Sequence, residues 1–427
     1  MTVRQAAFIG VGAMVGAGIF ALLGEAGAVA GSAAWISVLL AGVIAGFQGY
    51  SFAKLGARYP SAGGLLEYLA RGFGEGHITG ASCWLTYAAN IVVTALVAVS
   101  FGSYASSLII GEEAAAVWVK VFAAVILLAM LLLNVVGSQA VARVQSVIVW
   151  IVVGILLTFA AVTIWNMDPA LLDPSGYPSV RDIVSAVALT FFAFLGFGVI
   201  TFTAKDLPDP SRQLPPAMYL ALAIATVTYV AVALGVFGTL TVDEVIESGG
   251  TAIAVAAEPT LGRVGFWLMS VTGLFATAGA TNSGIYPAGG LSVQLASTGQ
   301  FPPMMGRMMR RAPVGMLVMV AATLVLAVGF DLNAIASIGS AVALLIFALV
   351  TLAHLRVRRE TGASLIPLIL GLLTTTVTLV VFATTTLVDE PAAAVALVAI
   401  IVLSVVLDLW WKRARRGREP SRTARSD

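Results

Sequence analysis

The chain has 427 residues, of which 59% are hydrophobic and only 10% charged, and its mean hydropathy is +1.00. Soluble domains carry about 25% charged residues, so this composition excludes a protein whose surface faces water and indicates one whose solvent is largely lipid. The single cysteine, Cys83, excludes a disulfide framework or a cysteine-based metal site. The two histidines, His77 and His354, lie far apart and beside loops, which argues against a metal cluster.

Apolar runs recur along the whole chain. A membrane-spanning helix needs about 20 apolar residues, and about twelve runs reach that length. They cover residues 6–30, 33–54, 78–109, 115–134, 144–165, 183–205, 215–240, 263–296, 313–330, 332–353, 365–388 and 391–411. The sequence therefore predicts an all-α integral membrane protein with about 12 transmembrane helices.

Positive charge is distributed unevenly between the loops. If the N-terminus is cytoplasmic and every run spans, all but three of the 23 lysines and arginines lie on the cytoplasmic side, the exceptions being Lys120, Arg181 and Arg263. The positive-inside rule predicts this asymmetry. We therefore expect a multi-pass protein of the plasma (cell inner) membrane with both termini in the cytoplasm.

The first run contains an unusual number of glycines. Residues 10–20 read GVGAMVGAGIF, although glycine costs about 1 kcal/mol relative to alanine in a helix. Close helix packing through Gly12 and Gly16 is one interpretation, because small residues let membrane helices approach. The other is a helix broken around Gly16, Ala17 and Gly18, whose freed backbone groups are tolerated only at a cavity or a buried site. This segment alone favours packing.

A second interrupted run in the other half of the chain changes that balance. Residues 191–217 read FFAFLGFGVITFTAKDLPDPSRQLPPA, with Gly196 and Gly198 near the middle of the sixth run. Interrupted helices at matching positions of two halves are typical of inverted-repeat transporters, and an odd number of helices in each half forces the halves to be inverted. We expect one transmembrane permease domain over residues 1–427, made of a first repeat (6–165), a second repeat (183–353), two additional helices (365–411) and a cytoplasmic basic tail (412–427).

Two broken helices indicate a class of substrate. The N-terminal amides of a half-helix suit a carboxylate, and C-terminal carbonyls suit an ammonium group. A site that offers both fits an α-amino acid zwitterion without a charged side chain, and the predicted spans hold almost no ionisable residue near their centres. We interpret the glycines as loosening the helix so that its backbone forms the binding site.

Several motifs together resemble the amino acid–polyamine–organocation permeases. Besides the two glycine-bearing runs, they are YPSAGGLLEYLARGFGEG from Tyr59, NVVGSQAVARVQ from Asn134 and ATNSGIYPAGGLSVQLASTGQFP from Ala280. The most similar members are the prokaryotic, proton-dependent, broad-specificity amino acid permeases, and the resemblance covers about residues 5–353 and, more weakly, the last two helices. It implies a leucine-transporter-type fold of five plus five inverted helices and two more, with helices 1 and 6 broken.

The resemblance also implies residue roles. Amides of the first segment would bind the substrate carboxylate, carbonyls of the second its ammonium, and Phe194 and Phe197 would close over its side chain unless they are ordinary packing residues. The two segments are Val15, Gly16, Ala17 and Gly18, and Phe194, Leu195 and Gly196 with Gly198 beside them. Asn90 and Asn282 are placed to face the interior, as ligands or, more often, as residues that form hydrogen bonds between helices.

A cytoplasmic gate and a coupling site are implied as well. Pro60, Gly63 and Gly64 would shape the loop that closes the gate, where Asp206 would pair with Arg58 or Arg212. The alternative is a solvated loop pair worth about 0–1 kcal/mol.

The coupling ion is not evident from the sequence. The fifth-helix position that holds a lysine in some proton-dependent members is Val152 here, and the partner hydroxyl of the eighth helix is also missing. A sodium site needs several oxygens, and only Thr277 and Thr281 remain nearby. Glu25, in the outer half of the first helix, is the candidate proton carrier, because intramembrane acids are functional by default. The alternative is that Glu25 lies close enough to the surface to be merely solvated.

The favoured function is a secondary transporter that moves neutral amino acids by alternating access, as a uniporter, an exchanger or a proton symporter. A polyamine or organic-cation transporter is disfavoured because the interior lacks acids, and a non-transporting amino acid sensor because the termini are short. An enzyme is not supported, since neither histidine falls within a predicted span, and no cofactor is indicated. We expect an amino acid as ligand, protons as one candidate coupling ion, and a monomer or homodimer.

The basic tail admits two interpretations. It begins at Trp410 and Trp411 and reads WWKRARRGREPSRTARSD. An interfacial tryptophan belt with cations beside anionic headgroups explains this tail better than a nucleic-acid partner does.

Overall fold

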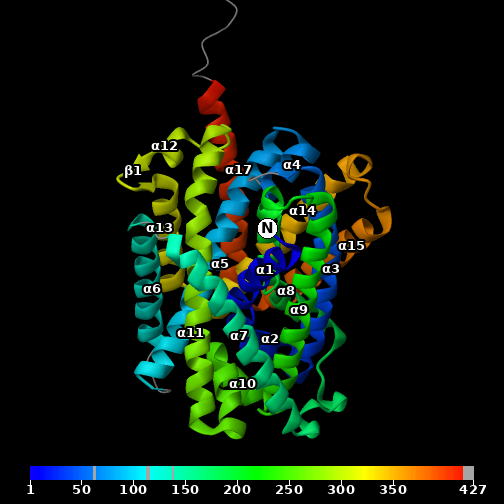
Figure 1. Ribbon diagram of the computed structural model, residues 1–427, viewed down its shortest axis with the longest axis vertical. Helices are drawn as coiled ribbons and strands as arrows, with labels where there is room; N and C mark the ends of the chain where they lie inside the picture. The colour runs from blue at the N-terminus through cyan, green and yellow to red at the C-terminus, as the bar shows by residue number, and fades with distance from the viewer. Residues whose placement is uncertain (61–63, 112–115, 137–138, 417–427) are drawn as a thin grey trace, which may run out of the picture.

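The computed structural model describes residues 1–60, 64–111, 116–136 and 139–416, with the side chains of residues 17, 139–147, 202, 205 and 416 left undescribed. Gly63 of the predicted gate loop and the tail from residue 417 therefore lie outside the described residues. Figure 1 shows the helices aligned mostly along the long axis of the molecule.

The chain is almost entirely helical, with one short hairpin of two two-residue strands. The elements in chain order are α1 (Val3–Ala17), α2 (Ile19–Ala30), η1 (Gly31–Ala33), α3 (Ala34–Arg58), α4 (Leu65–Phe73), α5 (His77–Ile109), α6 (Ala116–Val136), α7 (Gln139–Trp165), η2 (Pro169–Leu172), η3 (Pro174–Gly176), α8 (Val180–Phe192), η4 (Leu195–Asp206), α9 (Pro210–Phe237), α10 (Val242–Ser248), η5 (Gly249–Thr251), α11 (Ala252–Ser297), α12 (Pro303–Gly306), β1 (Met308–Met309), β2 (Ala312–Pro313), α13 (Val314–Gly329), α14 (Leu332–Thr361), α15 (Leu365–Thr384), α16 (Thr386–Asp389) and α17 (Pro391–Arg416).

The apolar runs form helices as predicted. Among the described residues, 10 helical segments are long and apolar enough to cross a membrane, and two shorter apolar helices, Val3–Gly16 and Val314–Gly329, accompany them. The prediction of an all-α membrane protein is confirmed, whereas the count of twelve spans stays a prediction. The eighth run begins earlier than expected, because α11 starts at Ala252 and continues through a kink at Gly262, where φ is 64°.

Both glycine-bearing runs are divided in the structure. Gly18 separates α1 from α2, with φ −104° and ψ −77°. In the other half, α8 ends at Phe192 and a 12-residue 3₁₀-helix, η4, follows from Leu195. A 3₁₀ segment of this length inside an apolar run is uncommon and marks either a hinge or a strained sequence.

The first helix lies at the centre of the bundle (Figure 1), where it packs against α7, α9, α11 and η4. In each of the outer helices α6 and α17, only 17% of the most apolar stretch of residues is buried inside the protein, so most of that surface faces outward. This arrangement places both divided runs in the interior, away from the lipid-facing surface.

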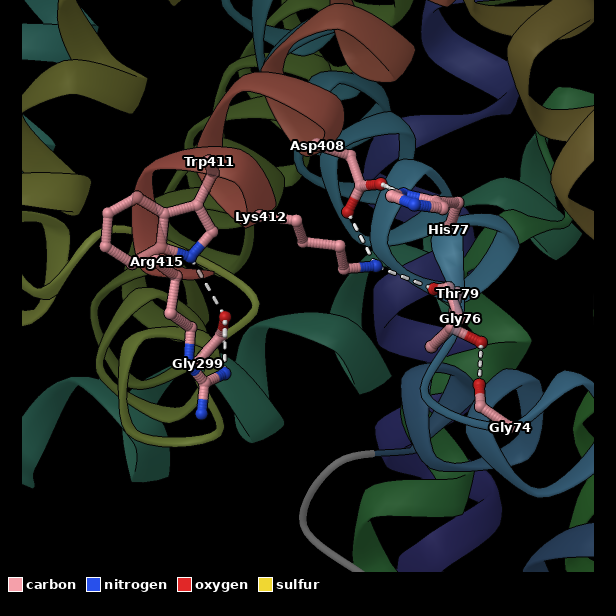
Figure 2. A network of polar contacts seen from close by, with 9 residues as sticks. All are labelled: Gly74, Gly76, His77, Thr79, Gly299, Asp408, Trp411, Lys412 and Arg415. Carbon is pink, nitrogen blue, oxygen red and sulfur yellow. Dashed lines mark hydrogen bonds and ion pairs between the residues drawn. The ribbon is translucent and has the colours of Figure 1, made fainter. Parts of the chain in front are cut away.

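Polar contacts fix the C-terminal end of α17 to two corners of the bundle (Figure 2). Asp408 is 1% exposed; its Oδ2 lies 2.7 Å from His77 Nδ1, and Lys412 Nζ is 2.9 Å from Oδ1, within ion-pair distance but without hydrogen-bond geometry. Trp411 is also buried and donates from Nε1 to the Gly299 carbonyl at 2.9 Å. The expected tryptophan belt is therefore wrong for Trp411, and only Trp410 is exposed.

Candidate functional site

The two chain interruptions lie directly against each other. A β-carbon built on Gly18 would lie 2.5 Å from Ala193 Cβ and 2.7 Å from the Ala193 carbonyl oxygen. A β-carbon on Gly196 would lie 2.4 Å from the Ala13 carbonyl carbon and 2.5 Å from the Met14 nitrogen. Only glycine allows backbone to approach backbone this closely, so the sequence brings the two divided runs into contact at these positions.

The other glycines of the first run are packing contacts too. A β-carbon on Gly10 would lie 2.3 Å from Ile200 Cδ1, one on Gly12 would lie 2.6 Å from Val149 Cγ2, and one on Gly16 would lie 2.6 Å from the Ala276 carbonyl oxygen. The glycines of this run therefore allow close helix packing, and the run is also interrupted at Gly18. Small residues let α1 touch η4, α7 and α11 at once.

The segment expected to bind a carboxylate is mostly helical in this structure. Val15, Gly16 and Ala17 form the last turn of α1, and the Gly18 amide donates to the Met14 carbonyl at 3.0 Å. The helix α2 begins at Ile19 immediately afterwards, so its N-terminus, with its partial positive charge, points into the region where the two runs meet.

The segment expected to bind an ammonium group supplies carbonyls at the end of α8 and the start of η4. The Phe194 carbonyl accepts from the Phe197 amide at 3.0 Å, and the Ala193 carbonyl accepts from Tyr229 Oη at 3.4 Å. Leu195 and Gly196, both partly exposed, begin η4. A carbonyl has two lone pairs, so one internal bond leaves room for a second donor.

The two candidate gating phenylalanines are fully buried. Phe194 packs on Tyr229 of α9 with ring centroids 5.2 Å apart, and Phe197 packs on Phe52 of α3 and Phe347 of α14 at 5.4 and 5.3 Å. Phe52 also meets the Tyr68 ring of α4 edge-on at 5.9 Å. We call Phe52, Tyr68, Phe197 and Phe347 the aromatic cluster. This cluster joins α3, α4, η4 and α14, so Phe197 belongs to an apolar contact that these four elements share.

The two candidate asparagines connect helices. Asn90 Nδ2 donates to the Gly284 carbonyl at 3.0 Å, joining α5 to α11. Asn282 Oδ1 accepts from Asn134 Nδ2 at 2.8 Å, joining α11 to α6. Both asparagines form hydrogen bonds between helices in this conformation. The sequence predicts this role as the more frequent one for such residues.

The structure does not bring the predicted gate pair together among the described residues, and the pair stays a prediction. Arg212 Nε instead lies 3.7 Å from Asp209 Oδ2, because Asp209 caps α9 three residues earlier. The Arg58 guanidinium lies over the Tyr59 ring at 5.7 Å. Asp206 is exposed, and its backbone carbonyl accepts from the chain's N-terminal ammonium at 3.0 Å.

A small cavity lies beside the first interruption, between α1, α7 and α11. Its volume is about 20 Å³, and Val152 lines it together with Gly16 and Ala280. That volume is enough for about one water molecule, but none of the lining side chains carries an oxygen or nitrogen atom. Thr277 and Thr281 donate to the carbonyls of Gly273 and Thr277 on their own helix at 2.7 and 2.8 Å. Among the described residues, the side chains that line this cavity therefore offer a cation no oxygen.

Glu25 has a second carboxylate as its neighbour. It lies in α2, partly buried, within electrostatic range of Glu390 at the start of α17. Glu390 Oε1 accepts from Asn333 Nδ2 at 2.5 Å, whereas its Oε2 is buried with no partner. Sequence reasoning did not find Glu390, because it lies between the last two predicted runs, at the boundary of the second one, and nothing local in the sequence relates it to Glu25.

His354 was also missed. The sequence placed it beside a loop, but it lies inside α14 and is fully buried. Its Nδ1 lies 2.7 Å from Ser51 Oγ of α3, and its Nε2 lies 2.8 Å from Thr361 Oγ1. Intramembrane ionisable residues are rare and mark functional candidates. The tenth run is predicted to end at residue 353, but the helix continues beyond it. That prediction therefore places this histidine outside the helix.

Some hydroxyl groups in the described interior are buried without a hydrogen-bond partner. Tyr104 of α5 and Ser337 and Ser340 of α14 are each buried without a hydrogen-bond partner among the described residues. Buried polar groups are normally paired, so these hydroxyls depart from the usual pattern of a helix interior. Tyr104 packs on Phe20, two residues after the first interruption, with ring centroids 5.8 Å apart.

A bundle of apolar helices whose interruptions meet in its interior is the architecture of a multi-pass membrane transporter. A family model described as amino acid permease matches residues 1–388. The chain therefore belongs to the amino acid permease family and is an amino acid transporter, not an enzyme.

Named relatives agree with this assignment. The chain is 31% identical to the inner membrane transport protein YbaT of Escherichia coli (strain K12) over 406 residues, 95% of this chain and 94% of the relative. It is 28% identical to the branched-chain amino acid permease BcaP of Bacillus subtilis (strain 168) over 249 residues, 54% and 53% of the two chains. It is 24% identical to the serine/threonine exchanger SteT of the same organism over 302 residues, 68% and 67%.

Proposed function

We propose that the protein moves neutral amino acids across the membrane by alternating access, with the substrate held between the two interruptions. The observation that carries this proposal is the backbone contact of Gly18 with Ala193. It places the N-terminus of α2 and the carbonyls that end α8 at one point. A zwitterion needs both partial charges, one for each of its groups.

The packing around η4 fits an occluded conformation in this proposal. The aromatic cluster closes the space on the α4 side of η4, and Phe197 within it is fully buried. Substrate would enter when η4 and α1 separate and when two local bonds also open, that of the Gly18 amide to Met14 and that of the Phe194 carbonyl to the Phe197 amide. Residues 6–165 and 183–353 act as the inverted repeats that make this movement reversible.

Neutral substrates are favoured over cations because the described part of the chain places no acidic side chain in α1, in the C-terminal half of α8 or in the first turn of η4. Branched-chain amino acids and serine or threonine, the substrates in the names of two relatives, are all neutral. Tyr104, Ser337 and Ser340 would line the side-chain end of the site as unpaired hydroxyls.

The deciding experiment is uptake of radiolabelled alanine and leucine into proteoliposomes of the purified protein. It is run with an inward proton gradient, with a sodium gradient, and with neither. Accumulation above equilibrium only with protons supports a symporter, and counterflow without either gradient supports an exchanger or uniporter. Failure to move either amino acid, in protein shown to be folded, would refute the proposal.

For coupling, we propose that Glu25 carries the transported proton and that the Glu390 carboxylate acts on it electrostatically. Two neighbouring carboxylates hold one proton more readily than two negative charges, and the cavity at Val152 offers no competing site. Glu25→Gln should abolish proton-driven accumulation but leave counterflow intact. Asp389→Asn, next to Glu390 but exposed, is the matched control.

A further inference from the structure

A groove on the outer flank of the bundle has no role in transport as described above. It runs between α6, α11 and α13, which lie side by side in Figure 1 and contact one another. Its volume is about 500 Å³. Tyr286, Gly290, Val293 and Ser297 line it along one face of α11, and Arg311 of the β1–β2 hairpin lies at one end.

The wall along α11 is open and largely apolar. Tyr286 is 74% exposed and Val293 40% exposed, and a β-carbon on Gly290 would meet nothing within 4 Å. The missing side chain at Gly290 thus leaves a channel in the surface of the helix. From Ser297 to Tyr286 the helix axis rises about 16 Å, close to the depth of one leaflet of a bilayer whose hydrocarbon core is about 30 Å thick.

The hairpin end of the groove is cationic. Arg307, Arg310 and Arg311 are partly or fully exposed, and none of the three has an ion pair or hydrogen bond from its side chain within the part of the chain that the structure describes. Met308 and Met309 beside them are each 56% exposed. Exposed apolar and cationic side chains in one short hairpin are typical of a segment at the membrane–water interface.

The corner that carries this hairpin is held in place by α17. The Gly299 carbonyl, two residues after α11 ends, accepts from Trp411 Nε1 at 2.9 Å and from Arg415 at 3.4 Å (Figure 2). The position of Arg311 relative to α11 is therefore set by packing on both sides, by α17 at Gly299 and by α13 after the hairpin.

We propose that this groove binds one anionic phospholipid, with its phosphate at Arg311 and an acyl chain along Gly290 and Tyr286. A guanidinium pairs with a phosphate through parallel hydrogen bonds, and the apolar channel has the length of a chain within one leaflet. The site is independent of the transport proposal, since none of the residues that line it belongs to α1, α2, α8 or η4.

Native mass spectrometry of the full-length protein, released from nanodiscs of equal parts phosphatidylglycerol and phosphatidylcholine, tests this site. The wild-type protein should retain phosphatidylglycerol in preference to phosphatidylcholine. Arg311→Gln should lower phosphatidylglycerol retention about fivefold, the value of one cation near an anionic surface. Gly290→Leu, which fills the channel, should lower the retention of both lipids.

Matched controls separate this site from general attraction to the membrane. Arg359→Gln removes an exposed arginine at the end of α14, and Gly154→Leu enlarges an exposed glycine of α7 with nothing within 4 Å of a β-carbon. Both controls should retain phosphatidylglycerol like the wild type. Equal retention by Arg311→Gln and the wild type, or equal loss in Arg359→Gln, would overturn the proposal. Because the Arg311 side chain has no ion pair or hydrogen bond within the described residues, its variant should fold even if Gly290→Leu does not.

Discussion

The backbone of Gly196 rests directly on the backbone of Ala13, so that a β-carbon on Gly196 would lie 2.4 Å from the Ala13 carbonyl carbon. This contact, between residues 183 positions apart in the chain, joins the two divided runs on which the proposed site depends. The atoms in contact belong to the backbone, which cannot move aside locally as the end of a flexible side chain can.

Gly196→Ala should therefore disrupt the site. Overpacking of this kind costs about 1–3 kcal/mol, and we expect a lower unfolding temperature and at least a tenfold loss of leucine uptake into proteoliposomes. Gly198→Ala is the matched control, because its β-carbon would meet only a Phe52 ring atom at 3.8 Å, an ordinary contact. Equal behaviour of the two variants would contradict the proposed role of the interruption.

Phe197 should contribute to stability through the aromatic cluster. Phe197→Ala removes ring contacts with Phe52 and Phe347 and should lower the free energy of unfolding by about 3–5 kcal/mol. Phe197→Leu, which keeps most of the volume, should cost less. Denaturant titration in mild detergent measures both. A Phe197→Ala protein as stable as the wild type would show that the ring is not packed as described.

The hydrogen bond between Ser51 and His354 offers a test of the buried polar contact between α3 and α14. Ser51→Ala removes the partner of His354 Nδ1 at 2.7 Å and should destabilise the protein by about 1–3 kcal/mol, the cost of an unsatisfied buried group. The double variant Ser51→Ala/His354→Leu should recover part of that loss, because no unsatisfied nitrogen remains. Additive losses in this double-mutant cycle would argue against the bond.

The contact of α17 with the N-terminus of α5 should depend on charge balance. Lys412→Met leaves the Asp408 carboxylate, 1% exposed, with His77 as its remaining partner. Breaking a buried ion pair by removing one member costs about 3–5 kcal/mol. Lys412→Met/Asp408→Asn should be more stable than Lys412→Met alone in a thermal unfolding assay. If the double variant is the less stable of the two, the ammonium does not compensate Asp408.

Parts of the proposed site could be predicted from the sequence because they depend on the local chain. The glycines of the first and sixth runs identified both divided segments, since glycine allows close approach wherever it occurs. The interpretation of Val152 as a position without coupling chemistry stays a prediction. The pairing of Gly18 with Ala193 and of Gly196 with Ala13 could not be predicted, because it depends on how two helices cross.

The sequence by itself determined the solvent and the helical class, and its glycines predicted which two runs are interrupted. Hydropathy and backbone propensity act over a few residues, so one chain read in order is sufficient for them. Only the tertiary structure decided which polar groups meet. Arg212 pairs with Asp209 rather than Asp206, Asn282 binds Asn134, and His354 lies inside α14 against Ser51. These contacts depend on the rotation of each helix about its axis and on the neighbour it faces, which local composition does not encode.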